Sequence, residues 1–234
     1  MRYIYILLCL ALLVNLCSKD DNRKIGFTYN FETGMDEWTV GYSDYPAGLS
    51  ADDSLTLYEM SYGHSFLPPT IVPPQGGIRV RGHNRSDDLF MFIKKEINGL
   101  STDTYYAVSF EIEIASNAPT NASGIGGAPG EGVTIKAGAV DHEPENIIDA
   151  GNWYRLNIDK GNQQQGGEDV AILGNIGVSD TTTVYTLIER KNSIPLVKKS
   201  DSSGNLWVII GTDSGFEGLT ELYYSAVKIV FEEQ

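Results

Sequence analysis

The segment His83–Asp88 is the densest group of chemically capable side chains in the sequence, and it reads His-Asn-Arg-Ser-Asp-Asp. Asp87 and Asp88 offer carboxylate oxygens, the ligands that calcium prefers, so these two residues are predicted to hold Ca²⁺. Asn84 and Arg85 are predicted to contact a ligand, with sugar as the alternative to calcium. A turn without a ligand is also open, because Asn, Ser and Asp form turns through local hydrogen bonds.

Charged side chains also alternate along three predicted strands, Gly77–His83, Val108–Ala115 and Val133–Val140. Successive side chains of a strand point to opposite faces, so the apolar residues take one face and the charged residues the other. If the three strands share a sheet, the charged residues form a mixed-sign ligand-binding surface beside the 83–88 loop. The alternative is a solvated face with ion pairs worth about 0–1 kcal/mol each. The charged set is Arg79, Arg81, His83, Glu111, Glu113 and Lys136.

Other catalytic patterns are incomplete. Gly124–Gly127 is rich in glycine like a phosphate-binding loop, but it precedes a strand and lacks the helix N-terminus that binds phosphate. Pro144 follows His142-Glu143 and breaks the helix that a His-Glu-x-x-His zinc motif requires. The sequence therefore favours a binding surface over a nucleotide or zinc site.

The elements that must position these residues are short strands. Alternating segments such as Thr104–Ala115, Leu206–Gly211, Glu221–Glu232 and Leu55–Tyr62 are separated by clusters of Gly, Pro, Asn and Asp. About ten such segments, with no long amphipathic helix, predict an all-β protein. We expect a single antiparallel β-sandwich domain over residues 25–234.

Charge and cysteine content exclude several classes of protein. Asp and Glu number 31 against 17 Lys and Arg, which gives a net charge of −14. Binding to nucleic-acid phosphates needs clusters of basic residues, so nucleic acid is not an expected partner. Cys9 and Cys17 are the two cysteines of the sequence. The predicted domain therefore has no thiol for catalysis, disulfides or metal binding.

The amino-terminal segment has the pattern of a secretion signal. Arg2 precedes Tyr3–Leu16, a stretch of 14 residues that is apolar except for Asn15. As a helix it would span about 21 Å, too short for a bilayer core of about 30 Å. This pattern indicates a cleaved signal peptide rather than a membrane-spanning helix.

The end of that segment resembles a lipoprotein signal. Val14-Asn15-Leu16-Cys17 is similar to a lipobox, and Cys17-Ser18-Lys19-Asp20-Asp21 resembles the export signal of Bacteroidetes-type surface lipoproteins. The resemblance implies a signal peptide over residues 1–16, an acylated Cys17 and a tether over residues 17–24. It further implies a lipid anchor in the outer membrane, with the protein facing the cell exterior.

The body of the chain resembles galactose-binding-like jelly rolls, which include many carbohydrate-binding modules. Asn30–Gly34 followed by Trp38 is similar to their opening strand, Thr104–Phe110 to a central strand and Glu221–Val227 to the closing strand. Ser225 and Ala226 stand where the family often has a calcium-binding Asp. The resemblance implies a jelly-roll sandwich that binds glycans.

Three functions follow from these patterns. The first is a non-catalytic glycan-binding lipoprotein, with sugar-stacking candidates at Trp38, Tyr42, Tyr45 and Trp153. The second is a jelly-roll polysaccharide lyase or glycoside hydrolase. Glu111 and Glu113 would lie about 6.6 Å apart along a strand, which permits a carboxylate pair. The third is an adhesion or accessory assembly lipoprotein, which a large exposed apolar patch would favour.

The lipid anchor predicts that labelled palmitate enters the wild-type protein and that Cys17→Ala abolishes labelling. Cys9→Ala is the matched control, because Cys9 lies in the segment that cleavage removes, and it should keep the label. Palmitate incorporation into the Cys17→Ala protein would contradict the anchor.

Overall fold

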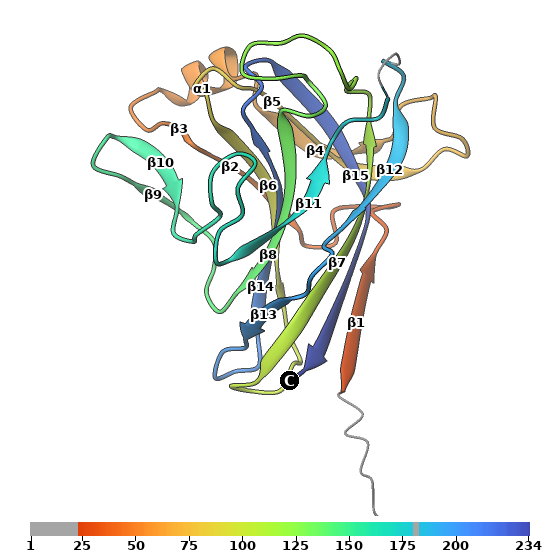
Figure 1. The fold of residues 1–234 in the computed structure, drawn as a ribbon, viewed down its shortest axis with the longest axis vertical. Coiled ribbons are helices and arrows are strands. Elements are labelled where there is room, and N and C mark those ends of the chain that lie inside the picture. Colours follow the sequence, from red (N-terminus) through yellow and green to blue (C-terminus); the bar gives the residue numbers. More distant parts are fainter. Residues whose placement is uncertain (1–22, 180–182) are drawn as a thin grey trace, which may run out of the picture.

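The computed structural model describes residues 23–179 and 183–234, and nearly all of its regular structure is β-strand. Cys17 and the predicted signal peptide lie outside the described residues. No helix within the described ranges is long and apolar enough to cross a membrane. The prediction of an all-β, antiparallel sandwich is confirmed (Figure 1).

Two large antiparallel sheets form the body of the molecule. Sheet A has the order β12-β7-β15-β5-β4, with β1 also paired to β15 and β13 to β7. Its strands are β1 (Lys24–Tyr29), β4 (Ser61–Phe66), β5 (Gly76–His83), β7 (Tyr105–Ser116), β12 (Thr186–Lys191), β13 (Leu196–Lys199) and β15 (Leu219–Glu233). Sheet B has the order β11-β8-β14-β6-β2. Its strands are β2 (Thr39–Ser43), β6 (Leu89–Ile97), β8 (Val133–Val140), β11 (Val170–Asn175) and β14 (Leu206–Ser214).

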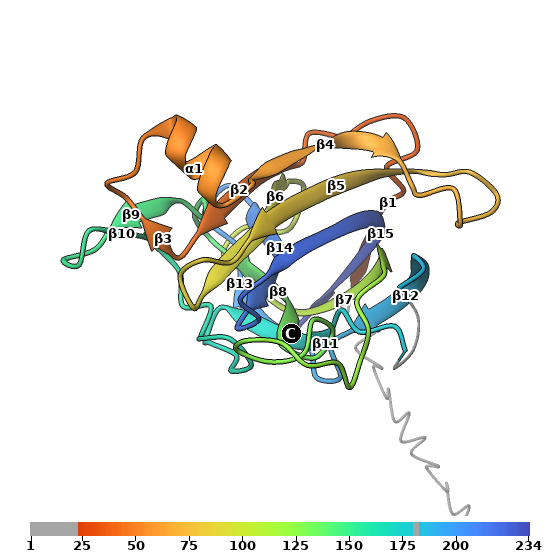
Figure 2. The same cartoon turned by 90° about the horizontal axis from the view of Figure 1, so that it is seen from above.

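The long strands pass back and forth between the two sheets. β5 and β7 belong to sheet A, whereas β6 and β8 belong to sheet B, and β14 in sheet B is followed by β15 in sheet A. This alternation is typical of jelly rolls. Figure 2 shows the two sheets facing each other.

One small sheet and one short helix lie at the side of the sandwich. The small sheet has the order β3-β10-β9 and consists of β3 (Tyr45–Pro46), β9 (Asn146–Ile148) and β10 (Trp153–Leu156). The helix α1 (Ala51–Leu57) occupies part of the predicted strand Leu55–Tyr62, and that part of the prediction is wrong. The Ser50 hydroxyl accepts the Asp53 backbone N–H at 3.0 Å, an N-cap that starts the helix.

The core between the sheets follows the predicted strand faces. On β7, Val108, Phe110, Ile112 and Ile114 are all buried in it. Trp38 is 2% exposed and packs edge-on against Tyr29 and Phe31. Trp38 is therefore a core residue, not a platform for sugar.

The outer face of sheet B is covered as well, which the sequence analysis did not predict. A covering segment, residues 141–169, packs Leu156 and Ile158 against this face, and every residue of β8 is buried. A second apolar cluster results, made of Phe90, Phe92, Val140, Leu156, Ile158, Val170 and Ile209. Antiparallel sheets often leave one face to water, and that rule underlay the expected exposure of Lys136.

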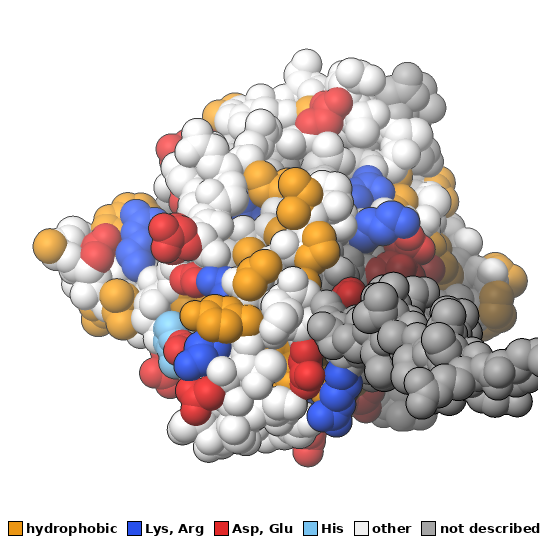
Figure 3. Space-filling model, turned by 60° about the horizontal axis from the view of Figure 1, so that its bottom comes forward, with side chains coloured by type: hydrophobic (Ala, Val, Ile, Leu, Met, Phe, Trp, Pro, Cys, Tyr) orange, Lys and Arg blue, Asp and Glu red, His pale blue; other side chains and the backbone are white. Residues whose placement is uncertain are grey.

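Charged side chains of both signs lie side by side with hydrophobic ones on the lower face of the molecule (Figure 3). Oppositely charged side chains at the surface form ion pairs, such as Lys94–Glu143 at 2.7 Å and Lys95–Glu37 at 2.9 Å. Such surface pairs contribute little to stability, so the burial of apolar side chains must supply most of it.

The packing between β14 and β6 is tight at Gly211. A Cβ there would lie 2.5 Å from the Phe90 ring and 2.8 Å from the Met91 carbonyl oxygen. Gly211→Ala should therefore lower the free energy of unfolding by about 1–3 kcal/mol in urea titrations. Gly34→Ala is the control, since a Cβ at Gly34 meets nothing within 4 Å. Equal effects of the two substitutions would refute the tight packing.

Candidate functional site

The predicted charged surface is only partly assembled. β5 and β7 do share sheet A, so Arg79, Arg81, Glu111 and Glu113 all lie on its outer face. Lys136 does not join them, because β8 belongs to sheet B and its side chain is fully buried under the covering segment. The strand-face prediction for Lys136 was right about direction and wrong about exposure and sheet.

The two arginines of sheet A are held by carboxylates. Arg79 donates to Glu221 at 2.9 Å, and Arg81 donates to Glu59 at 2.6 Å. His83 also lies 2.9 Å from Glu59. On the same face the Ser225 hydroxyl donates to Glu113 at 2.7 Å, and Lys228 lies 3.7 Å from Glu111. This pattern of ion pairs matches the solvated-face alternative.

The 83–88 loop is a structural turn at Asn84. Its side-chain amide is buried and donates to the carbonyl oxygens of Ser214, at 2.7 Å, and Phe216, at 3.2 Å, while its side-chain oxygen accepts the Ser86 N–H. Arg85 is exposed and donates to the Leu57 carbonyl oxygen at 3.2 Å. Asn84 therefore fastens the loop to β14 rather than facing a ligand.

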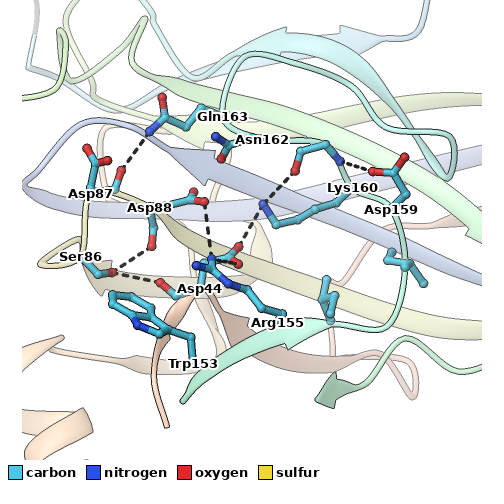
Figure 4. A pocket seen from close by; sticks show the side chains of 13 residues that line it. Asp44, Ser86, Asp87, Asp88, Trp153, Arg155, Asp159, Lys160, Asn162 and Gln163 are labelled. Carbon is cyan, nitrogen blue, oxygen red and sulfur yellow. Dashed lines mark hydrogen bonds and ion pairs between the residues drawn. The ribbon is translucent and has the colours of Figure 1, made fainter. Parts of the chain in front are cut away.

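Asp87 and Asp88 point in different directions (Figure 4). Asp87 has a left-handed backbone, with φ of 68°, and is exposed. Asp88 turns inward to Asp44 and Asp213, and one carboxylate oxygen from each of these three lies within 4.8 Å of the others. The structure thus separates the two predicted calcium ligands.

Cationic side chains already neutralise the three inward carboxyl groups. The Nζ atoms of Lys136 and Lys160 lie 2.8 and 2.9 Å from one Asp213 oxygen. Lys160 also lies 3.0 Å from Asp44, and Arg155 lies 2.6 Å from Asp44. We call these six residues the charge cluster: Asp44, Asp88, Lys136, Arg155, Lys160 and Asp213. Three positive groups facing three carboxyl groups leave no charge for a divalent cation, so the cluster does not fit calcium.

One carboxyl of the cluster holds a proton at neutral pH. Burial, followed by the hydrogen bond and the charge of Asp213, raises the pKa of Asp88 from 3.8 to about 8. Two like charges this close in a dry site cannot both ionise freely. The Asp88 carboxyl is therefore a hydrogen-bond donor.

Four residues of the charge cluster line an open cleft of about 510 Å³, namely Asp44, Asp88, Arg155 and Lys160. Trp153, Asn162, Gln163 and Asp87 stand at its mouth in Figure 4. Arg155 stacks against the Trp153 ring, with 5.3 Å between the guanidinium carbon and the ring centroid. The cleft therefore combines an aromatic ring with amide, carboxylate and guanidinium groups.

A second hollow, the tyrosine groove, lies beside the same small sheet. It has a volume of about 660 Å³ and is lined by Tyr42, Tyr45, Leu49, Leu55, Met60, Ser61, Tyr62 and Tyr154. Residues that are adjacent in the sequence line different hollows, because successive side chains of a strand point to opposite sides. Asp44 and Arg155 line the cleft, whereas their neighbours Tyr45 and Tyr154 line the groove.

Sequence reasoning missed Asp44, Arg155, Lys160, Asp213 and the groove tyrosines Tyr62 and Tyr154. A usable signal existed for Asp213 and Lys136. Each interrupts an apolar segment, Leu206–Ser214 and Val133–Val140 respectively. A charge inside such a segment indicates a buried, paired group as readily as an exposed face.

The solved structures that resemble this chain do so at low sequence identity. No protein-family model and no curated protein matches the chain. Among solved structures, a carbohydrate-binding module in complex with β-1,4-galactotriose is 10% identical, with coverage of 86% of this chain and 92% of that one and a TM-score of 0.37. A mannan-recognising carbohydrate-binding module is 10% identical, with coverage of 89% and 98% and a TM-score of 0.38.

A cyclase from Fischerella sp. TAU is also 10% identical, with coverage of 89% and 98% and a TM-score of 0.43. At these identities and TM-scores the matches carry no function over to this chain, so function is argued from the chain's own sites.

Asp88 predicts a distinctive pH dependence. Between its ordinary pKa of 3.8 and about 8, the folded protein holds a proton that the unfolded chain releases. The contribution of Asp88 to stability is therefore full at low pH and is lost as the pH rises toward 8. Urea midpoints of the wild type should fall relative to those of Asp88→Asn across this window. Parallel pH profiles of the two proteins would show that Asp88 is ionised in the fold.

Proposed function

We propose that this protein is a surface lipoprotein that binds glycans without catalysing their cleavage, and that the tyrosine groove is the binding site. The observation that carries the proposal is the set of four tyrosines, Tyr42, Tyr45, Tyr62 and Tyr154, around one open hollow. Aromatic rings supply flat apolar area with a polar tip, which suits sugar rings that have apolar faces and hydroxyl edges.

The groove is preorganised by contacts that leave rings accessible. The Tyr42 hydroxyl donates to the carbonyl oxygens of Ser61 and Arg81, both at 3.0 Å, which fixes its ring at the base. Tyr45 packs against Tyr154 with 4.9 Å between the ring centroids. Tyr62 is 55% exposed at the rim. A ligand would meet rings that are already in place, which reduces the entropy cost of binding.

The cleft on the other side of β3 and β10 supports the same function. Trp153, Asn162, Gln163 and Asp87 offer a ring and hydrogen-bonding groups of the kind that hydroxyl-rich ligands use. The two candidate platforms Tyr42 and Tyr45 line the groove, and Trp153 lines the cleft.

The proposed lipid anchor is compatible with this placement. β1 begins at Lys24, which pairs with Glu232 of β15. Tyr62 of β4 pairs with Val80 of β5, and Val80 in turn pairs with Leu222 of β15. Glu232 and Leu222 are ten residues apart on β15, which is about 33 Å along an extended strand. A chain anchored through Cys17 and its tether would hold the groove away from the membrane.

A jelly-roll hydrolase or lyase is the second candidate, and one observation favours it. Asp88, a protonated carboxylic acid, lines the cleft, and such an acid can protonate a glycosidic oxygen. An enzyme would cleave its glycan and would lose turnover, but not binding, in Asp88→Asn. An adhesion or accessory role would appear as binding to a protein partner with no glycan ligand.

The groove proposal predicts that Tyr62→Ala and Tyr154→Ala each weaken binding on a glycan array by about two- to twelvefold, because each removes a stacking surface worth about 0.5–1.5 kcal/mol. Tyr105→Ala is a matched control. Tyr105 is also 55% exposed, but it lies at the start of β7, near the carboxy end of β15 and outside the groove.

Three outcomes of this experiment contradict the proposal. They are an array on which the wild type binds nothing, equal losses in Tyr62→Ala and Tyr105→Ala, and intact binding in both groove variants. Circular dichroism of each variant checks that the sandwich is retained.

A further inference from the structure

Lys136 and Asp213 form a buried pair on the two central strands of sheet B. Lys136 lies on β8 opposite Gly211 of β14, and Asp213 lies two residues further along β14, opposite Thr134. Both side chains are 0% exposed, and the Lys136 Nζ lies 2.8 Å from an Asp213 carboxylate oxygen. Gly211 has no side chain, and the Phe90 ring packs over it beside the pair.

The surroundings of the pair are dry. The apolar cluster of Phe90, Leu156, Ile158 and Ile209 lies on the same face of sheet B under the covering segment. Lys136 also donates to the carbonyl oxygens of Lys160, at 2.9 Å, and Gln165, at 2.7 Å. The amine is thus fixed within contact distance of the carboxyl, the arrangement in which an intramolecular reaction gains most from proximity.

Asp88 supplies the third group that a condensation needs. The buried Oδ1 atoms of Asp88 and Asp213 make no hydrogen bond to a donor in the described part of the chain. One oxygen of each carboxyl lies within 4.8 Å of the other. A proton carried by Asp88 and directed at Asp213 satisfies both atoms, so Asp88 stands next to the reacting carboxyl with a transferable proton.

We propose that Lys136 and Asp213 condense to form an intramolecular amide bond, with Asp88 as the proton-transfer group. A proton passes from the Lys136 ammonium to the Asp213 carboxylate, which leaves a neutral amine and a neutral acid. The Nζ lone pair attacks Cγ of Asp213 and forms the C–N bond. Asp88 gives its proton to a carboxyl oxygen, the C–O bond breaks, and one water molecule leaves. The Asp88 carboxylate then takes one proton from the nitrogen, which restores the acid.

The reacting amine is Lys136 rather than Lys160. Burial lowers the pKa of Lys136 despite the nearby charge of Asp213, which favours the uncharged nucleophile. Burial acts in the same direction on Lys160, but Asp213 and Asp44 outweigh it and raise the pKa of that side chain. Lys160 therefore stays an ammonium 2.9 Å from the Asp213 oxygen, where it stabilises negative charge that develops during the attack.

The bond would join β8 to β14 covalently in a domain that has no cysteine. A cross-link between residues 136 and 213 closes a long loop of the unfolded chain, which stabilises the fold as a disulfide would. Asp88 also lines the open cleft, so the released water has a route out. This inference does not depend on glycan binding.

The test is the mass of the intact wild-type protein after denaturation. We expect a value lower by one water molecule than the mass that the processed sequence requires. Tryptic digestion should yield a branched peptide in which residues 96–155, uncut at Lys136, are joined to residues 200–228. Tandem mass spectrometry locates the link. An intact mass that equals the full sequence mass, with no loss of water, would overturn the proposal. A branched peptide in which residues 156–190 are joined through Lys160 would overturn it as well.

Substitutions separate the roles of the three residues. Lys136→Arg and Asp213→Ala, denatured before measurement, should lack the branched peptide whether or not they fold fully. The first variant has no amine that can form this amide, and the second has no carboxyl group. Asp88→Asn should lose most of the cross-link, and Asp87→Asn, its exposed neighbour, should retain it. Full cross-linking in Asp88→Asn would overturn the assignment of Asp88 as the proton-transfer group.

Discussion

The pairing of buried charges behind sheet B is the constraint on which the rest of this structure depends. Asp213 has no exposed surface, and a lone carboxylate there would be strongly destabilising, so Lys136 and Lys160 must both be present. Lys136 comes from β8 and Lys160 from the covering segment. Their shared carboxylate therefore ties that segment to the sheet, and loss of one partner should cost far more than loss of a surface pair.

The covering segment in turn creates both hollows. It brings β10 beside β3, with Tyr154 paired to Tyr45 and Trp153 to Pro46. Strand alternation then directs Arg155 toward Asp44 and Tyr154 toward the tyrosine groove. A layer that buries apolar side chains of sheet B thus also builds a charged cleft on one side and an aromatic groove on the other. The stability of the fold and the proposed binding site both depend on this segment.

The carboxyl groups of the cluster are stabilised by neighbouring cations and by a proton rather than by a metal ion. Asp88 holds a proton because burial and the neighbouring Asp213 disfavour its ionised form. Arg155 meets Asp44 at the edge of the cleft, where one side of the guanidinium still stacks on Trp153. The amine of Lys136, the carboxyl of Asp213 and the acid of Asp88 are close together because each group lowers the cost of burying the others in a dry site. The proposed condensation uses this arrangement.

Local patterns in the sequence were sufficient for most of the long strands and for the side chains that these strands direct into the core, but not for the short strands β2, β9, β11 and β13. The alternation on β7 and β5 predicted which side chains are buried, because a period of two is a property of any strand. It also placed Arg79 and Glu111 on one outer face. The helix α1 was missed, although Ser50 and Asp53 carry a local capping signal that could have located its start.

The tertiary structure alone decided which strands share a sheet and what covers them. Lys136 points away from the main core, as the sequence indicates, but whether that direction leads to water depends on residues 141–169, which are distant in the chain. Asp44, Asp88 and Asp213 are separated by tens of residues, and only the crossing of β2, the 83–88 loop and β14 brings them together. The sequence by itself determined an all-β domain with defined strand faces, whereas the charge cluster is a product of long-range strand pairing, which no local pattern encodes.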